Sequence, residues 1–187
     1  MRRLLALLSL ILLMSCAHAQ NKLEPIRLCV STVQNSSRSL VDMTWQRDQL
    51  IKAFERINKG KDVTKGKAAR IETVQLESYS ETDPAVREND CQFILHTNLT
   101  EIIHAGTSDM TTRPRSVQVG NPGGDSRANP SDSNSATVEY RIMQAGVLDA
   151  RASGVVTAHD QLPDEMLVSH LMDQIASRVA GELRERH

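Results

Sequence analysis

The sequence predicts an α/β (α+β) domain with a mixed sheet, and three observations lead to it. Residues 26–99 alternate strand-like apolar runs with helical patterns, residues 137–158 alternate as a hairpin does, and residues 164–184 form a long amphipathic helix. Alternation of strands and helices favours parallel pairing with right-handed crossovers, and a hairpin adds antiparallel strands. We therefore expect a four- to five-stranded sheet in the order β-α-β-α-β-loop-β-β-α. Two main helices pack it, the C-terminal one being the longer.

Residues 1–19 have the form of a signal peptide. Arg2 and Arg3 precede an apolar run at 4–14, and the small residues Ala17 and Ala19 form a cleavage pattern. The run is shorter than the roughly 20 residues that a helix needs to cross a bilayer. We expect cleavage after Ala19 and a single periplasmic or secreted domain at 20–187.

Cys16 offers an alternative end for the exported chain. Residues 13–16 (Leu-Met-Ser-Cys) resemble a bacterial lipobox, in which Cys16 becomes the lipidated first residue. The protein would then be a membrane-anchored lipoprotein. No later apolar run is long enough to span a membrane, so no transmembrane segment is expected in the mature chain.

Charge and aromatic content exclude some partners. The formal charge is −1, and loss of Arg2 and Arg3 with the signal leaves −3. Nucleic-acid binding normally shows as a basic patch, and bases stack on aromatic side chains, which make up 3% of this chain. We expect no nucleic-acid partner.

The first strand and helix are predicted at 26–33 and 44–58. The strand is apolar and β-branched, and the helix has apolar residues at spacings of three and four. Asp42 or Thr44 could cap the helix and Gly60 could end it. The basic segment 59–67 follows. It is interpreted as a solvated connector in preference to a contact for phosphate or an acidic partner, because it lacks the Gly-Lys-Ser/Thr ending of a P-loop.

The next elements are a strand at 70–78, a short helix from Pro84 to Asn89 with Asp83 as its cap, and a strand at 91–99. Residues 105–135 then become rich in Pro, Gly, Ser and Asn. So polar a stretch cannot offset its ordering entropy, which predicts a flexible insertion and a place for a partner-binding segment.

The last elements are the clearest. Residues 137–144 alternate apolar and polar side chains, 145–149 turn, and 150–158 return as a strand. The final helix at 164–184 has an apolar residue every four positions, and Pro163 stands at its start.

Two cysteines remain after export, Cys29 and Cys91, both in predicted strands. An oxidising compartment favours a bridge between them. Neighbouring parallel strands rarely aim two Cβ atoms well, so a pair of small buried thiols is the slightly favoured alternative.

The sequence contains no recognisable catalytic, cofactor-binding or metal-ligating pattern, so we expect no enzyme activity and no cofactor. No nucleophile elbow, Ser-x-x-Lys or zinc-ligand spacing occurs, and His96 is interpreted as structural or as a surface residue. The serines after the first strand are typical of turns. The other histidines and the dispersed carboxylates are His104, His159, His170, His187, Glu72, Glu77, Glu81, Glu101 and Glu139.

The strings at 30–37, 44–50, 89–95 and 138–142 resemble a family of uncharacterised exported bacterial proteins. More remotely, the element order is similar to the small periplasmic domains of the TolB amino-terminal and LpoB type. That resemblance implies a role in envelope assembly or activation by binding. The long insertion departs from the pattern.

We therefore expect an exported, non-catalytic binding or assembly module with an envelope protein as partner. One alternative is a secreted hydrolase with a dispersed acidic site, which a carboxylate cluster or a Ser–His pair in one cleft would favour. Another is an apolar ligand site at Met143, Met166 and Met172, although such methionines usually belong to a core.

Overall fold

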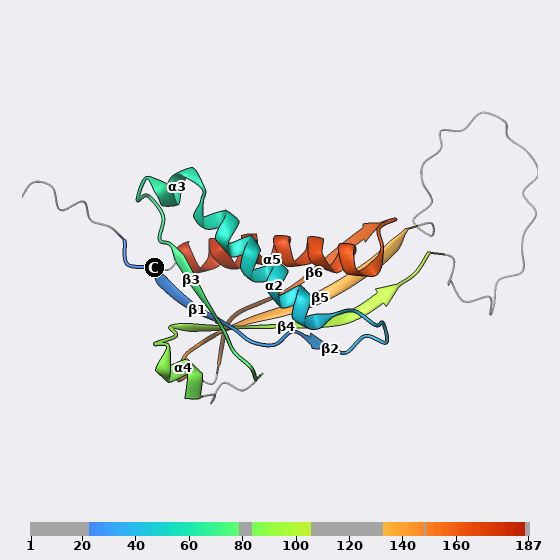
Figure 1. Ribbon diagram of the computed structural model, residues 1–187, viewed down its shortest axis with the longest axis horizontal. Helices are drawn as coiled ribbons and strands as arrows, with labels where there is room; N and C mark the ends of the chain where they lie inside the picture. The colour runs from blue at the N-terminus through green and yellow to red at the C-terminus, as the bar shows by residue number, and fades with distance from the viewer. Residues whose placement is uncertain (1–22, 79–83, 106–132, 148, 186–187) are drawn as a thin grey trace, which may run out of the picture.

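The computed structural model describes residues 23–78, 84–105, 133–147 and 149–185. It confirms the mixed α/β class: a six-stranded sheet carries a layer of helices (Figure 1). The strands are β1 Ile26–Val30, β2 Gln34–Asn35, β3 Ile71–Gln75, β4 Phe93–Ile103, β5 Asn134–Gln144 and β6 Ala150–Asp160. The helices are α2 Met43–Asn58, α3 Lys61–Thr64, α4 Pro84–Glu88 and α5 Asp164–Glu185.

The sheet has the order β3-β1-β4-β5-β6, with β2 beside the distal part of β4. β1 pairs parallel with β3 and β4, as the strand–helix alternation predicts, whereas β4, β5 and β6 form an antiparallel meander. The sheet therefore has a parallel half built from short strands and an antiparallel half built from three strands of 11 residues.

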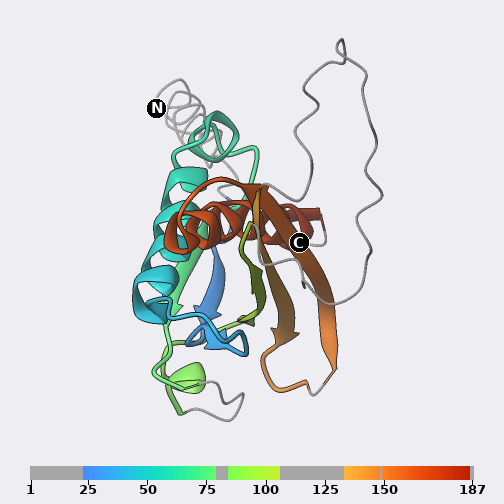
Figure 2. The same ribbon diagram turned by 90° about the vertical axis from the view of Figure 1, so that its right-hand side faces the viewer.

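α2 and α5 lie against the same face of the sheet and against each other (Figure 2). Asp42 caps α2 by accepting hydrogen bonds from the backbone N–H groups of Thr44 and Trp45 (2.9 and 3.0 Å). At α5, the Pro163 carbonyl accepts the N–H of Leu167 (2.9 Å). These contacts satisfy donors that a helix start leaves unpaired.

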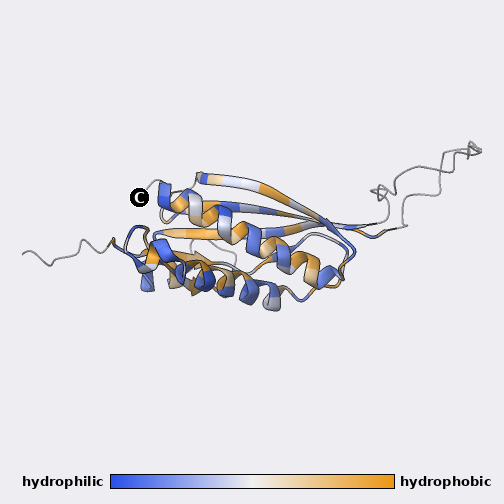
Figure 3. Ribbon diagram, turned by 90° about the horizontal axis from the view of Figure 1, so that it is seen from above, coloured by the Kyte–Doolittle hydropathy of each residue, from blue (hydrophilic) through white to orange (hydrophobic). Residues whose placement is uncertain are grey.

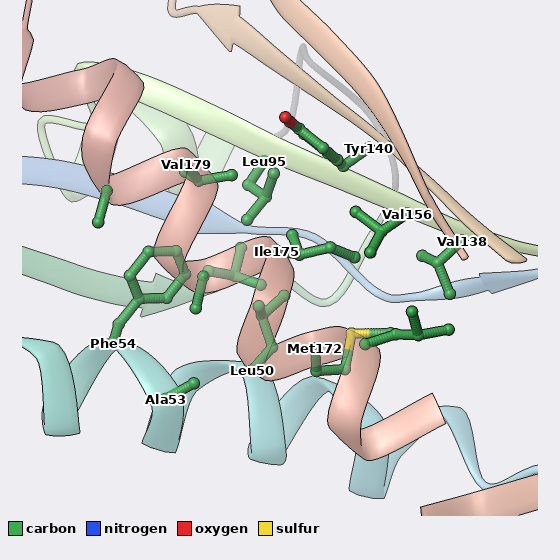
Figure 4. Packing of buried hydrophobic residues seen from close by; sticks show 14 of the residues in the cluster. Leu50, Ala53, Phe54, Leu95, Val138, Tyr140, Val156, Met172, Ile175 and Val179 are labelled. Carbon is green, nitrogen blue, oxygen red and sulfur yellow. The ribbon is translucent and has the colours of Figure 1, made fainter. Parts of the chain in front are cut away.

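The main core fills the space between these two helices and the sheet (Figure 4). Phe54 of α2 and Ile175 of α5 are fully buried against Leu95 of β4. Figure 3 shows the same amphipathic division along the helices. The apolar residues whose spacing predicted helices at 44–58 and 164–184 form the buried helix faces of this core.

A smaller cluster lies on the opposite face, at the end where α4 sits. It consists of Cys29, Leu76, Val86, Cys91, Ile94 and Met143. Cys29, Ile94 and Met143 alternate with main-core residues on their strands, and successive strand side chains point to opposite faces. α4 supplies Val86, so this cluster is a small second core.

Several boundaries differ from the sequence prediction. β1 ends at Val30, and the two-residue β2 forms further on, where the chain meets β4 again. β4 runs on to Ile103 and β5 begins at Asn134, because the two strands stay paired past a register shift between Leu99 and Glu101. The short helix α3 lies in a segment interpreted as a loop.

Residues 106–132 of the predicted insertion lie outside the described residues. Its first position, 105, and its last three, which enter or adjoin β5, are described. Within the described part of the chain, none of the helices is both long enough and apolar enough to cross a membrane.

Candidate functional site

The candidate site is the part of the sheet opposite α2 and α5 that continues beyond the small second core. We call it the open face; its residues are Gln34 of β2, His96 and Asn98 of β4, Glu139 and Arg141 of β5, and Ser153, Val155 and Thr157 of β6. These side chains gather because the strands hold them in register. His96 lies opposite Arg141, and Asn98 lies between Gln34 and Glu139.

A hollow of about 190 Å³ opens on this face. Gln34, His96, Asn98, Glu139 and Arg141 line it, together with part of Tyr140. Its lining offers amide, imidazole, guanidinium and carboxylate groups within one small space. Such a lining suits a polar or charged group of a partner and not an apolar ligand.

Glu139 and Arg141 are exposed and carry opposite charges on one face of β5. Neither is within 4.0 Å of an oppositely charged side chain among the residues that the structure describes. Both charges therefore remain available to a partner, the guanidinium as a forked donor and the carboxylate as an acceptor.

Ser31 and His96 form a buried pair beneath the hollow. The Ser31 hydroxyl lies 3.1 Å from Nδ1 of His96 and also 3.1 Å from the Leu95 carbonyl. Ser31 is fully buried and His96 is 4% exposed. In the arrangement in which the hydroxyl proton is donated to the Leu95 carbonyl, the imidazole Nδ1–H donates to the serine oxygen, and in that arrangement the histidine is not the base of the serine.

β6 borders the open face and is an edge strand. The Val155 carbonyl accepts a hydrogen bond from Nη1 of Arg178 on α5 (3.3 Å), so that carbonyl points away from β5. By the alternation of a strand, the backbone groups of Ser153 and Thr157 point the same way. Val155 is 53% exposed. No other described strand pairs with this edge.

Tyr140 connects the open-face strand β5 to the helical layer. Its hydroxyl donates to the Glu182 carboxylate of α5 at 3.0 Å. Burial raises the pKa of Tyr140, and the hydrogen bond to Glu182 acts in the same direction. The hydroxyl therefore stays protonated at neutral pH and keeps β5 fixed against α5.

Cys29 and Cys91 are joined by a disulfide, with their Cα atoms 5.7 Å apart. Cys91 does not belong to a strand, contrary to the prediction. It lies in the turn between α4 and β4, where Asp90 adopts a positive φ of 50°. Because Cys91 lies in a turn, its Cβ atom is not held in the orientation of a parallel strand, which would aim it poorly at Cys29. Cys16 lies outside the described residues.

The other predicted polar residues that the structure describes form no metal-binding cluster. His104 contacts Asp164 at the start of α5 (2.9 Å), whereas His159 and His170 are exposed on β6 and α5. Glu81 and His187 lie outside the described residues. Among the residues that the structure describes, no three His, Cys, Asp or Glu side chains are placed to hold a metal ion.

The three methionines of the apolar-ligand hypothesis occupy three different environments. Met172 is in the main core, Met143 is in the small core on the opposite face, and Met166 is 54% exposed. The three methionines do not line one pocket, so they do not support an apolar ligand site.

Sequence reasoning did not single out six members of the open face: Gln34, Asn98, Arg141, Ser153, Val155 and Thr157. The signal for Arg141 was present, because it alternates with Val138, Tyr140 and Ile142, which face the core. Gln34 and Asn98 could not be paired from the sequence, since their contact depends on the irregular return of the chain in β2.

No protein-family model matches the sequence, and no curated protein matches it. Solved structures do. A PelC dodecamer from Paraburkholderia phytofirmans has a TM-score of 0.51 at 8% identity, covering 86% of this chain and 88% of that chain. A second PelC dodecamer, from another crystal form, gives 0.52 at 8% identity, with 83% and 88% covered.

The hypothetical protein CT253 from Chlamydia trachomatis has a TM-score of 0.50 at 11% identity, covering 84% of this chain and 97% of that chain. This chain is thus similar in structure to an uncharacterised bacterial protein, as the resemblance implied in its coarser form. At such identities the likeness shows the fold alone. The relation to TolB and LpoB domains stays a prediction.

Proposed function

We propose that this protein is an exported, non-catalytic binding or assembly module of the bacterial envelope, and that a second protein chain docks along β6 and the adjoining open face. The single observation that carries the proposal is the long free edge of β6 beside an exposed pair of unneutralised charges, Glu139 and Arg141. The signal-like segment at 1–19 supports the exported location.

An edge strand offers unpaired backbone groups to an incoming strand, and side-chain pockets beside it supply selectivity. Here Ser153 and Thr157 direct backbone groups outward, while the 190 Å³ hollow begins one strand inward, at β5. The similarity in fold to PelC, whose structures are dodecamers, supports assembly between chains as one form of such docking.

The proposal is tested by site-specific photo-crosslinking in cells that express the protein. A crosslinker replaces Val155 on the free edge, and a control crosslinker replaces Lys52, which is exposed on α2. We expect a discrete protein adduct from position 155 and none from position 52. An adduct of twice the chain mass identifies a second copy, and any other mass identifies a different protein.

Val155→Pro sharpens the test. The Val155 N–H points away from β5, so proline removes a donor from the free edge without removing a bond of the sheet. We expect the partner to be lost while the unfolding temperature stays close to that of the native protein. Equal adducts from positions 155 and 52, or an adduct that survives Val155→Pro, would refute docking on β6.

A second candidate function is hydrolysis, because Ser31 and His96 form the kind of pair that a hydrolase uses. Two features weigh against it. The serine is fully buried, and its hydroxyl has backbone carbonyls of Leu95 (3.1 Å) and Thr32 (3.4 Å) as acceptors. A nucleophile needs both access to substrate and a base that takes its proton.

A fluorophosphonate probe separates the two candidates. Labelling that disappears in Ser31→Ala would support a serine hydrolase and would count against a purely non-catalytic module. We expect no labelling of Ser31 and no change in partner crosslinking when this buried serine is replaced by alanine.

A further inference from the structure

A second charged region lies where α2, α3 and β3 meet. We call it the basic corner; its residues are 59–70. It contains five basic residues and one acidic residue, Asp62, a net charge of +4 in a chain whose total is −1. Figure 1 shows α3 at the end of the domain where β1 begins.

The basic corner is a fixed structure. Asn58 clamps the start of β3 with two hydrogen bonds to the backbone of Ile71 (2.7 and 3.0 Å). Arg184 of α5 donates to the Ala69 carbonyl at 3.0 Å, and the Asp62 carbonyl accepts the N–H groups of Lys67 and Ala68. The lysines therefore project from an ordered frame, which lowers the entropy cost of presenting them together.

The positive charge of this corner is not neutralised by the residues that the structure describes. None of its five basic side chains is within 4.0 Å of a carboxylate among the described residues. Burial lowers the pKa of Arg184, and the negative charge of Asp62 opposes that shift in part. Counting the flanking acids Glu24 and Glu55 together with Arg184 still leaves +3.

The corner also contains a hollow of about 560 Å³. Lys59 and Arg70 supply cationic groups to its wall, Glu55 supplies one carboxylate, and Leu23, Val63 and Ala68 supply apolar groups. Leu23 is 50% exposed. A surface with ordered cations beside exposed apolar groups is complementary to a phospholipid membrane surface, where phosphates lie above hydrocarbon.

The position of the corner in the chain indicates which anionic surface it meets. Leu23 lies seven residues after Cys16 and four after Ala19. If Cys16 carries a lipid, the connecting residues reach at most about 25 Å, so the corner is held near a bilayer. If cleavage follows Ala19, the same charges provide membrane contact without a lipid anchor at Cys16.

We propose that the basic corner docks on an anionic phospholipid surface, with Lys59, Lys61, Lys65, Lys67 and Arg70 contacting lipid phosphates. This inference rests on the exported location proposed above, but its surface chemistry is independent of β6. It would leave β6 and the open face turned toward a partner while the opposite end rests on the membrane.

The test is sedimentation of the purified, exported chain carrying Cys16→Ala, which cannot be lipidated, with phosphatidylcholine vesicles that contain or lack phosphatidylglycerol. We expect binding only to the anionic vesicles and a steep loss with salt, because surface charges are screened within a Debye length. Each basic residue near an anionic surface contributes about a fivefold gain in affinity. K61Q/K65Q/K67Q should therefore weaken binding about a hundredfold.

The matched control is R38Q/K52Q/R87Q, which removes the same charge from exposed positions outside the corner. It should bind like the parent chain. Equal weakening by both triple variants would mean that binding depends on the net charge of the chain and not on the basic corner. Equal binding to both vesicle types would mean that binding is not electrostatic. Either result overturns the proposal. Full displacement by free inorganic phosphate would likewise overturn it in favour of a soluble phosphate site. Loss of the β6 adduct would not affect this result.

Discussion

The two faces of the sheet are made from the same strands but have different roles. On β5, Ile142 is 1% exposed against the helices, while its neighbour Arg141 is exposed on the open face. The covered face is apolar and fills the space between α2 and α5, whereas the open face carries charges that no described group neutralises. Alternate residues of one strand therefore serve stability and binding, so a substitution on one face can change one property without changing the other.

The largest expected effect comes from the covered face. Phe54→Ala should lower the free energy of unfolding by about 4 kcal/mol, because it empties a fully buried site between α2 and the sheet. Trp45→Ala on the same helix is the control, since Trp45 is 38% exposed, and it should cost about 1 kcal/mol. Denaturant unfolding measures both. Similar losses would show that the two faces of α2 are not energetically distinct.

The next effect concerns the small core on the opposite face. Cys29→Ala with Cys91→Ala should cost about 3 kcal/mol, because the disulfide closes a loop with a sequence separation of 62 in the unfolded chain. Intact mass after alkylation with and without reduction tests the bridge itself. Alkylation of the exported protein before reduction would mean that both thiols are free.

The division into faces was predictable where periodicity is strong. The alternation at 137–144 predicted the buried residues of β5, and the apolar spacing at 164–184 predicted the helix that covers them. Both signals are local, because burial of one face imposes a fixed period on a strand or a helix. The class of the fold followed from the order of these elements and is confirmed.

The parts that failed depend on contacts between distant segments. Ser31 and His96 are 65 residues apart and meet only through the parallel pairing of β1 with β4. Cys91 was placed at the start of a strand because the apolar run 93–95 follows it closely, whereas Asp90 has a positive φ and Cys91 lies in a turn. No local pattern specifies a parallel register, so the hollow on the open face could not be assembled from the sequence.

A smaller effect tests a close contact within the covered face. A Cβ atom at Gly154 would lie 2.7 Å from the ring and hydroxyl of Tyr140, its partner on β5. Gly154→Ala should therefore displace that ring from Glu182 and cost about 2 kcal/mol. Gly181→Ala, in the exposed part of α5 with open space around it, should instead stabilise by about 0.8 kcal/mol. Thermal unfolding of the pair decides; the same sign for both would contradict the packing described here.

The smallest effect on stability should come from the open face, and it is the sharpest test of the division. Arg141→Ala should change the free energy of unfolding by less than about 0.5 kcal/mol, since its guanidinium has no ion-pair partner among the described residues. Ile142→Ala, one position along, should cost about 3 kcal/mol. Arg141→Ala should nevertheless abolish the adduct formed by the crosslinker at position 155, although the fold remains intact. If Arg141→Ala keeps both stability and adduct, the charges of the open face are not part of the docking surface, and docking would be confined to the backbone edge of β6.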